Sequence, residues 1–225
     1  MQKSDHEVDV VLDKTITLFR FVSEKDVFER YYKLHLAKRL LHGRSVSDDA
    51  ERGMLAKLKV ECGFQFTQKL EGMFNDIKLS AESNQLYKSH IEHTAVCRHL
   101  VGQMIVAYLS LCLQTQGIAM NVTIMTSTFW PTLHSDTRCT LTTELATVMS
   151  SYERFYLSRH SGRRLTWEPS LGSADIRIRF KTKTHEVNVA TFAFVILSLF
   201  EDVEDGTRLS YEVHCLAVFL ASAGN

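Results

Sequence analysis

The sequence predicts an α+β protein in two parts, a helical bundle followed by a smaller region in which strands and helices mix. Apolar residues recur every three or four positions between Leu12 and Ile77, which is typical of amphipathic helices. After Ile118 the period changes to two in several short runs, which is typical of half-buried strands. We therefore predict a bundle at residues 1–117, an α/β subdomain at 118–190 and a last segment at 191–225.

The composition is that of an ordinary globular protein, with 45% hydrophobic and 23% charged residues. The 26 basic residues balance 26 acidic ones, so net charge favours neither nucleic acid nor an anionic membrane as a partner. The five cysteines include no Cys-x-x-Cys pair, which predicts reduced thiols and neither a zinc finger nor a disulfide framework. Because the polar N-terminus is no signal peptide, we expect a protein of the cytoplasm and nucleus.

The first predicted helix runs over residues 12–41 and carries an apolar stripe with a period of four. The stripe consists of Phe28, Tyr32, Leu36 and Leu40, widened by Val27, Tyr31 and Leu41. Ser23, with Asp26 three residues on, has the pattern of an N-cap inside this stretch. Gly43, between His42 and Arg44, predicts the end of the helix.

Two further helices are predicted in the first part. The second begins at Ser45 or Ser47, and the third follows Gly63. Their apolar positions are Ala50, Met54, Leu58 and Cys62 in the second helix, and Phe66, Leu70, Met73, Phe74 and Ile77 in the third. Three such stripes are buried most simply by packing into a bundle.

The second part alternates strands and helices. The predicted strands carry Val122, Ile124 and Thr126, then Ile176, Ile178 and Phe180, then Val187 and Val189. A helix is expected at 144–160, with Met149, Tyr152, Phe155 and Tyr156 on its inner face. Thr191 is the expected cap of an apolar helix that reaches Phe200 and should be buried on most sides.

Three blocks of this sequence resemble the cullin family. The first runs from Leu12 to Asp76 and includes Lys69-Leu70-Glu71-Gly72-Met73-Phe74, the second is Phe129-Trp130-Pro131, and the third joins His160-Ser161-Gly162-Arg163 to Gly172-Ser173-Ala174-Asp175. They are similar to the C-terminal half of a cullin: the end of its four-helix bundle, its α/β subdomain and the start of a winged-helix module. The run from Ser45 to Asp49 resembles the cullin-3 branch.

The resemblance implies a non-catalytic scaffold of a cullin-RING ubiquitin ligase that acts in ubiquitin-dependent protein catabolism. In that family this half holds a RING-box protein, whose N-terminal strand adds to the α/β sheet, and the RING domain recruits a ubiquitin-conjugating enzyme. Strand addition relies on backbone hydrogen bonds. The candidate receiving residues are Val122, Ile124, Thr126, Ile176, Ile178 and Phe180, and which edge pairs with the partner stays open. No cofactor, metal, membrane or nucleic acid is expected.

The sequence departs from the cullin pattern in three places. The adaptor-binding repeats upstream and the neddylation lysine downstream have no counterpart here. Residues 95–114 form an apolar stretch without a cullin counterpart, interrupted by Arg98, His99 and Gln103 and so unsuited to span a bilayer. This stretch is either translated intron sequence or an added helix, and the tail from Val213 is open to the same intron interpretation.

Other functions fit isolated residues. Lys33, Lys38, Arg39 and Arg44 would suit a helical or winged-helix protein that binds nucleic acid, but acidic neighbours favour a solvated face. His90, Glu92, His93 and His99 show no sign of converging on a metal ion. Ser161 beside His160 would suit a hydrolase, but the Gly-x-Ser-x-Gly turn that presents such a nucleophile is missing.

Overall fold

The computed structural model describes residues 5–41, 48–100, 118–131, 139–179, 182–200 and 203, with only the backbone of 94–100. The chain divides into two compact units, Met1–Leu86 with Asn121–Thr132, and Tyr87–Met120 with Leu133–Asn225. The predicted stop at Gly43, the starts at Ser45 and Ser47, Phe180, residues 101–114 and the tail from Val213 lie outside the described residues. Helices and strands together confirm the α+β class.

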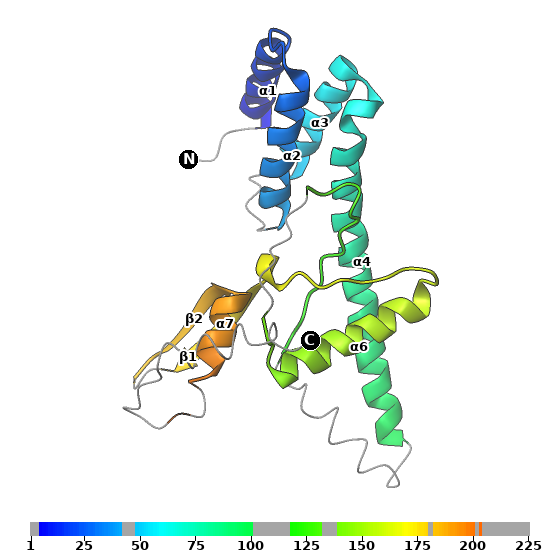
Figure 1. Cartoon of the computed structure of the whole chain (residues 1–225), viewed down its shortest axis with the longest axis vertical. Coiled ribbons are helices and arrows are strands. Elements are labelled where there is room, and N and C mark those ends of the chain that lie inside the picture. The colour runs from blue at the N-terminus through cyan, green and yellow to red at the C-terminus, as the bar shows by residue number, and fades with distance from the viewer. Residues whose placement is uncertain are drawn as a thin grey trace, which may run out of the picture. The chain divides into compact units, whose positions relative to one another are not determined.

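The first unit contains α1 (Asp5–Phe19), α2 (Lys25–Leu41), α3 (Asp48–Cys62) and the first part of α4 (Phe64–Leu100), which lie side by side (Figure 1). The single helix predicted for 12–41 is therefore wrong, because the chain turns between α1 and α2. The amides of Phe21 and Val22 bond to carbonyls three residues back, at 3.1 and 3.0 Å, which tightens the last turn of α1 and ends it.

The N-cap prediction for Ser23 is also wrong. The amide of Phe28 donates to the carbonyl of Glu24 at 3.2 Å, and α2 begins at Lys25. Glu24 therefore holds the capping position, one residue after the predicted one. The capping pattern at Ser23 marked this break to within one residue, although the apolar run that includes Phe21 favoured one continuous helix.

Two apolar clusters hold the first unit together. The larger one consists of Leu36, Ala37, Leu55, Leu70, Met73, Phe74 and Trp130, and the smaller of Ile16, Phe19, Met54 and Leu58. Tyr32 packs against both clusters. The predicted stripe of α2 is confirmed around Leu36, but Val27 and Tyr31 are 43% and 61% exposed because the buried face is narrower than predicted.

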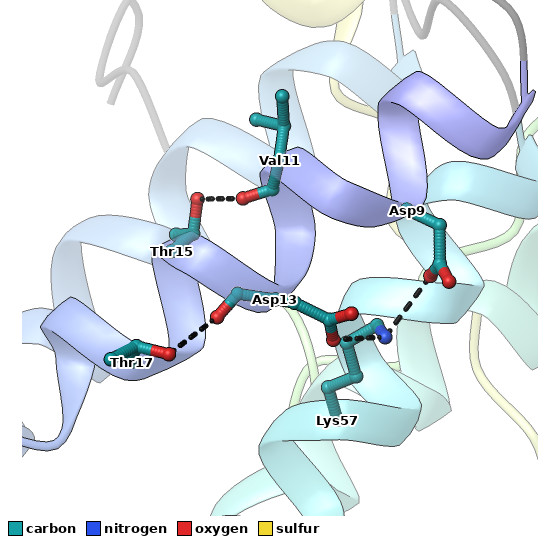
Figure 2. Close-up of polar contacts among 6 residues, drawn as sticks. All are labelled: Asp9, Val11, Asp13, Thr15, Thr17 and Lys57. Atoms are coloured by element: carbon teal, nitrogen blue, oxygen red, sulfur yellow. Dashed lines mark hydrogen bonds and ion pairs between the residues drawn. The ribbon is translucent and has the colours of Figure 1, made fainter.

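Polar contacts on the surface add a link between α1 and α3. Figure 2 shows the Lys57 ammonium between two carboxylates of α1, with Nζ 3.0 Å from Asp9 Oδ1 and 2.6 Å from Asp13 Oδ1. In α1 itself, Thr15 and Thr17 donate hydrogen bonds to the carbonyls four residues back, Val11 and Asp13. Since both carboxylates are more than half exposed, these ion pairs orient the helices more than they stabilise them.

Gly63 separates α3 from α4, as predicted. Its φ of +83° lies in the left-handed region, which glycine enters at little cost, and its amide bonds to the Lys59 carbonyl at 2.9 Å. Helix α4 then begins at Phe64. Glycine therefore allows a tight reversal between two packed helices.

The second unit contains the end of α4, α6 (Thr143–Arg159), the short helix η1 (Pro169–Leu171), β1 (Ser173–Arg179), β2 (Thr184–Ala190) and α7 (Thr191–Ser198). The helix predicted at 144–160 is confirmed as α6. Its Tyr152 and Phe155 lie with ring centroids 4.9 and 5.2 Å from that of Tyr87 on α4. Thr142 caps α6 by accepting a hydrogen bond from the Leu145 amide.

Helix α7 is less buried than predicted. It packs against β1, β2 and η1, but Val195 is its one buried side chain, while Leu197 and the following Phe200 are 40% and 43% exposed. Thr191 is its first residue and Ala190 holds the capping position without a side-chain bond, so the cap prediction is wrong. Among the described residues the sheet of β1 and β2 has two strands, which are too few to cover a helix that is apolar all round.

Candidate partner-binding site

The residues predicted as the first strand form an extended segment that lies along α4. Val122 and Ile124 belong to no strand in the described chain, so that part of the prediction is wrong. The Val122 amide donates to Asn84 Oδ1 at 2.9 Å, and Asn84 Nδ2 donates to the Val122 carbonyl at 3.0 Å. The Ile124 amide donates to Ser80 Oγ at 2.8 Å. We call residues 122–126 the docked segment.

The C-terminal end of the docked segment, at Thr126, is fixed by a buried carboxylate. Asp76 is 6% exposed, and its Oδ2 accepts hydrogen bonds from the Thr126 amide at 2.7 Å and from Trp130 Nε1 at 2.8 Å. Thr126 Oγ1 donates to the other carboxylate oxygen at 3.0 Å. Such bonds are what a buried carboxylate needs to offset the loss of water.

The spacing of the partners explains why a helix can hold an extended chain. The side chains that hold the segment lie four residues apart on α4, a rise of about 6 Å. The backbone groups that they hold lie two residues apart, a rise of about 6.6 Å. We call this set the polar row: Asp76, Ser80 and Asn84.

The polar row was missed by the sequence analysis. The apolar stripe of α4 passes through Met73 and Ile77, and the row continues the same side of the helix with polar residues. Polar residues at helical spacing usually face water, and only the buried state of Asp76 and Ser80 separates them from a solvated face. The available signal was a polar continuation of an apolar stripe.

Aromatic residues close the end of the segment. The Phe129 ring lies against α4 at Gly72, where a Cβ would stand 2.8 Å or less from three ring atoms. Trp130 is 5% exposed within the larger apolar cluster. The Phe129 and Trp130 amides both donate to the Thr126 carbonyl, which makes the turn that follows the docked segment.

No described residue bonds to the opposite edge of the docked segment. In an extended chain, successive residues direct their backbone groups to alternate sides. Thr123 and Met125 therefore direct theirs away from the polar row, and they make no backbone hydrogen bond with any described residue. Thr123 is exposed, whereas the Met125 side chain packs against the larger cluster.

The other predicted site residues lie in the second unit. The second and third predicted strands are confirmed as β1 and β2, which pair antiparallel with Ile176 opposite Val187 and Ile178 opposite His185. Ala174, Ile176 and Ile178 make one half-buried face of β1. In the described part of the chain this sheet has two strands, so each has an outer edge without a strand beside it.

The opposite face of the sheet is polar. Arg177 Nη2 lies 2.7 Å from Glu186 Oε1, and Asn188 Nδ2 donates to Asp175 Oδ1 at 2.6 Å, in both cases between residues directly opposite each other. Cross-strand pairs of this kind fix the register. On this face, Arg177 is paired with Glu186 and Asp175 with Asn188.

The residues considered for a hydrolase lie in a turn at the end of α6. The His160 amide donates to the Tyr156 carbonyl at 3.1 Å. The ring centroids of His160 and Tyr156 lie 4.4 Å apart. Ser161 is exposed, and Gly162 follows with a φ of +75°. No hydrogen bond joins Ser161 to His160 in the described part of the chain.

Neither a metal centre nor a membrane span is found in what the structure describes. No group of three His, Cys, Asp or Glu side chains there could hold a metal ion. None of the described helices combines the length and the apolar character needed to cross a bilayer.

The basic residues of α2 are only partly available to a ligand. Arg39 Nη2 donates to Glu51 Oε2 at 3.0 Å, and this hydrogen bond raises the pKa of Arg39. Burial, followed by the charge of Lys69, lowers the pKa of Lys33. Arg44 lies outside the described residues.

Two family models match the chain. One, described as the cullin alpha solenoid domain, matches residues 1–84, and the other, the cullin alpha+beta domain, matches 124–214. Residues 122–123 of the docked segment lie between the two matches, and residues 124–126 lie at the start of the second. Together the two matches cover most of the chain.

Curated relatives agree with these matches. Cullin-3 of Dictyostelium discoideum is 45% identical over 88% of this chain and 23% of its own length, and cullin-3 of Schizosaccharomyces pombe is 46% identical over 91% and 24%. Cullin-3A of Arabidopsis thaliana is 43% identical over 93% and 25%. The chain thus spans about a quarter of each of these relatives, and their names agree with the predicted likeness to the cullin-3 branch. On these matches, the chain belongs to the cullin family.

Proposed function

We propose that this chain is a non-catalytic scaffold segment of a cullin-RING ubiquitin ligase and that it binds a RING-box protein. The observation that carries the proposal is the docked segment, one edge of which is held by α4 while the other offers Thr123 and Met125. Family membership supports the same function.

The proposed mode of binding is strand addition. A strand of the RING-box protein pairs with the free edge of the docked segment through backbone bonds, so the affinity depends little on the side chains there. The bound RING domain then brings a ubiquitin-conjugating enzyme to the ligase in the cytoplasm and nucleus. The outer edges of β1 and β2, which include Ile176 and Ile178, are the second candidate receivers.

The first test is co-expression of the chain with a RING-box protein, followed by size-exclusion chromatography. We expect the two to co-elute as a one-to-one complex. An aggregated chain that leaves the RING-box protein in its own peak would contradict the proposal. The nucleic-acid-binding alternative is not favoured by the cullin matches.

A substitution at Thr123 tests the mode of binding. Thr123→Pro removes the outward amide without touching a bond to α4, so we expect it to abolish co-elution. Thr123→Val is the matched control, because it keeps the amide and changes only the side chain. Binding by Thr123→Pro would move the receiving edge to β1 or β2, and hydrogen exchange of the complex would show which amides become protected.

A further inference from the structure

We propose that Asp76, Ser80 and Asn84 are positioning residues for the partner strand. In this proposal, the polar row takes the place of a neighbouring strand: it keeps the docked segment extended and sets its register, so that the opposite edge is ready to pair. The proposal rests on the proposed binding of a RING-box protein. It assigns a role to side chains that never touch that partner.

The hydrogen bonds of Asn84 are those of a strand residue. Its side-chain amide accepts from the Val122 amide at 2.9 Å and donates to the Val122 carbonyl at 3.0 Å. In an antiparallel sheet, a residue in a hydrogen-bonded pair exchanges the same two bonds with the residue opposite. Asn84 thus satisfies both backbone groups of Val122, and α4 replaces one strand of a ladder.

Ser80 continues this arrangement in the middle of the row. Its hydroxyl accepts from the Ile124 amide at 2.8 Å and donates to the Asp76 carbonyl at 2.6 Å. Ser80 is only 4% exposed, so water does not compete for these bonds. The hydroxyl also lies 3.4 Å from the Ile124 carbonyl, a second possible acceptor, so Ser80 contacts both backbone groups of Ile124.

The register is set at the Asp76 end. Trp130 and Thr126 both bond to the Asp76 carboxylate, and Phe129 fits against Gly72. A slip of one residue would turn the Thr123 amide toward α4 and the Val122 amide outward. Because Asn84 holds the far end, the row prevents such a slip along the whole docked segment.

A strand that is already extended is a better receiver. Pairing with a disordered segment would include the entropy cost of ordering its backbone, and pre-organisation removes that cost from the binding step. The hydrogen bonds of the polar row offset this entropy cost when the chain folds, before the partner binds. Weakening the row should therefore lower the affinity for the partner while the fold of the first unit is retained.

The test replaces Asn84 and compares it with a neighbour. Asn84→Ala removes both bonds to Val122, and Glu82→Ala changes an exposed residue of the same helix as the matched control. Both substitutions introduce a better or equal helix former, so α4 itself is not weakened. The measurements are the dissociation constant for the purified RING-box protein, amide hydrogen exchange of the free chain, and the urea midpoint.

Three results are expected. Asn84→Ala weakens RING-box binding about tenfold, the equivalent of one or two net hydrogen bonds. In the free chain the amides of Val122 and Ile124 exchange faster than in the wild type, while amides in the core of α2 and α3 stay protected and the urea midpoint falls by no more than the loss of one or two net hydrogen bonds implies. Glu82→Ala behaves as the wild type in all three measurements.

The outcomes separate this proposal from the proposed function. Unchanged affinity in Asn84→Ala, with or without faster exchange, overturns the positioning role. If the wild-type chain binds no RING-box protein, the proposed function fails, and faster exchange in Asn84→Ala then limits the row to a structural role. Unchanged exchange in that variant refutes even the structural role.

Discussion

Tyr32 is the residue whose ionisation is most altered by the fold. Its ring packs against both apolar clusters, and its hydroxyl lies 3.4 Å from Glu51 Oε2. Burial, followed by the Glu51 charge, raises the pKa of Tyr32 far above its usual value, although Arg39 acts in the opposite direction. The folded chain therefore holds this phenolic proton where the unfolded chain releases it.

This difference predicts a loss of stability in alkali. A free tyrosine releases its proton near pH 10, so below about pH 10 the contribution of Tyr32 is fully present and above it the free energy of unfolding falls. Tyr32→Phe should reduce that fall by at most about 1.4 kcal/mol per pH unit. Urea denaturation at about pH 8 and about pH 11 measures it, with Tyr31→Phe as the matched control. Equal slopes in wild type and Tyr32→Phe would contradict the prediction.

At the scale of elements, glycine governs how closely helices approach their neighbours. Gly72→Ala would drive a Cβ into the ring of Phe129, which has to move away from α4. We expect this overpacking to cost about 1–3 kcal/mol of unfolding free energy. Gly53→Ala in α3 meets only Leu12 Cδ1 at 3.5 Å and gains helix propensity, so it should stabilise by up to about 1 kcal/mol.

Chemical denaturation of the two variants measures this contrast, since the substitution is the same in both and the expected signs are opposite. A neutral Gly72→Ala would mean that Phe129 does not lie on α4. A destabilised Gly53→Ala would mean that α1 and α3 approach more closely than the structure shows.

Much of the helical part of the fold could be predicted from periodicity. The stripe centred on Leu36, the break at Gly63 and the aromatic face of α6 all follow from spacing along one helix. The turn between α1 and α2 was signalled to within one residue by the capping pattern at Ser23, but the apolar residues on both sides of it favoured one continuous helix. The pattern of a single sequence predicts contacts within one helix, but it does not predict contacts between elements.

The candidate site shows the same limit. Alternation at Val122, Ile124 and Thr126 correctly indicated extended backbone, yet alternation does not say what the backbone bonds to. The partners are about forty to fifty residues away on α4, a separation that no local pattern spans. The sheet of β1 and β2 was predicted because its partners are close in the chain.

At the scale of the whole molecule, apolar side chains left on the surface set its tendency to associate. Leu197 and Phe200 are 40% and 43% exposed at the end of α7, and Val187 is 38% exposed on β2. Exposed apolar side chains promote association. In the part of the chain that the structure describes, the two strands of the sheet leave these side chains partly exposed.

We therefore expect the isolated chain to associate with rising concentration, and Leu197→Gln to reduce this. Light scattering coupled to size-exclusion chromatography over a range of loading concentrations measures the effect. Val60→Gln is the matched control, because Val60 is 89% exposed and belongs to the first unit, whereas Leu197 belongs to the second. If both variants reduce association equally, total apolar surface and not the end of α7 is responsible.

The fit between α4 and the docked segment also imposes a parity on the chain. Even-numbered residues from Val122 to Thr126 bond to the helix, and odd-numbered ones direct their backbone outward. A single-residue insertion within this stretch reverses the alternation beyond the insertion point. Residues that bonded to the helix would then direct their backbone groups outward, and their neighbours would face the helix. A change of length between Asn84 and Val122, by contrast, alters neither the spacing of the polar row nor the alternation of the docked segment.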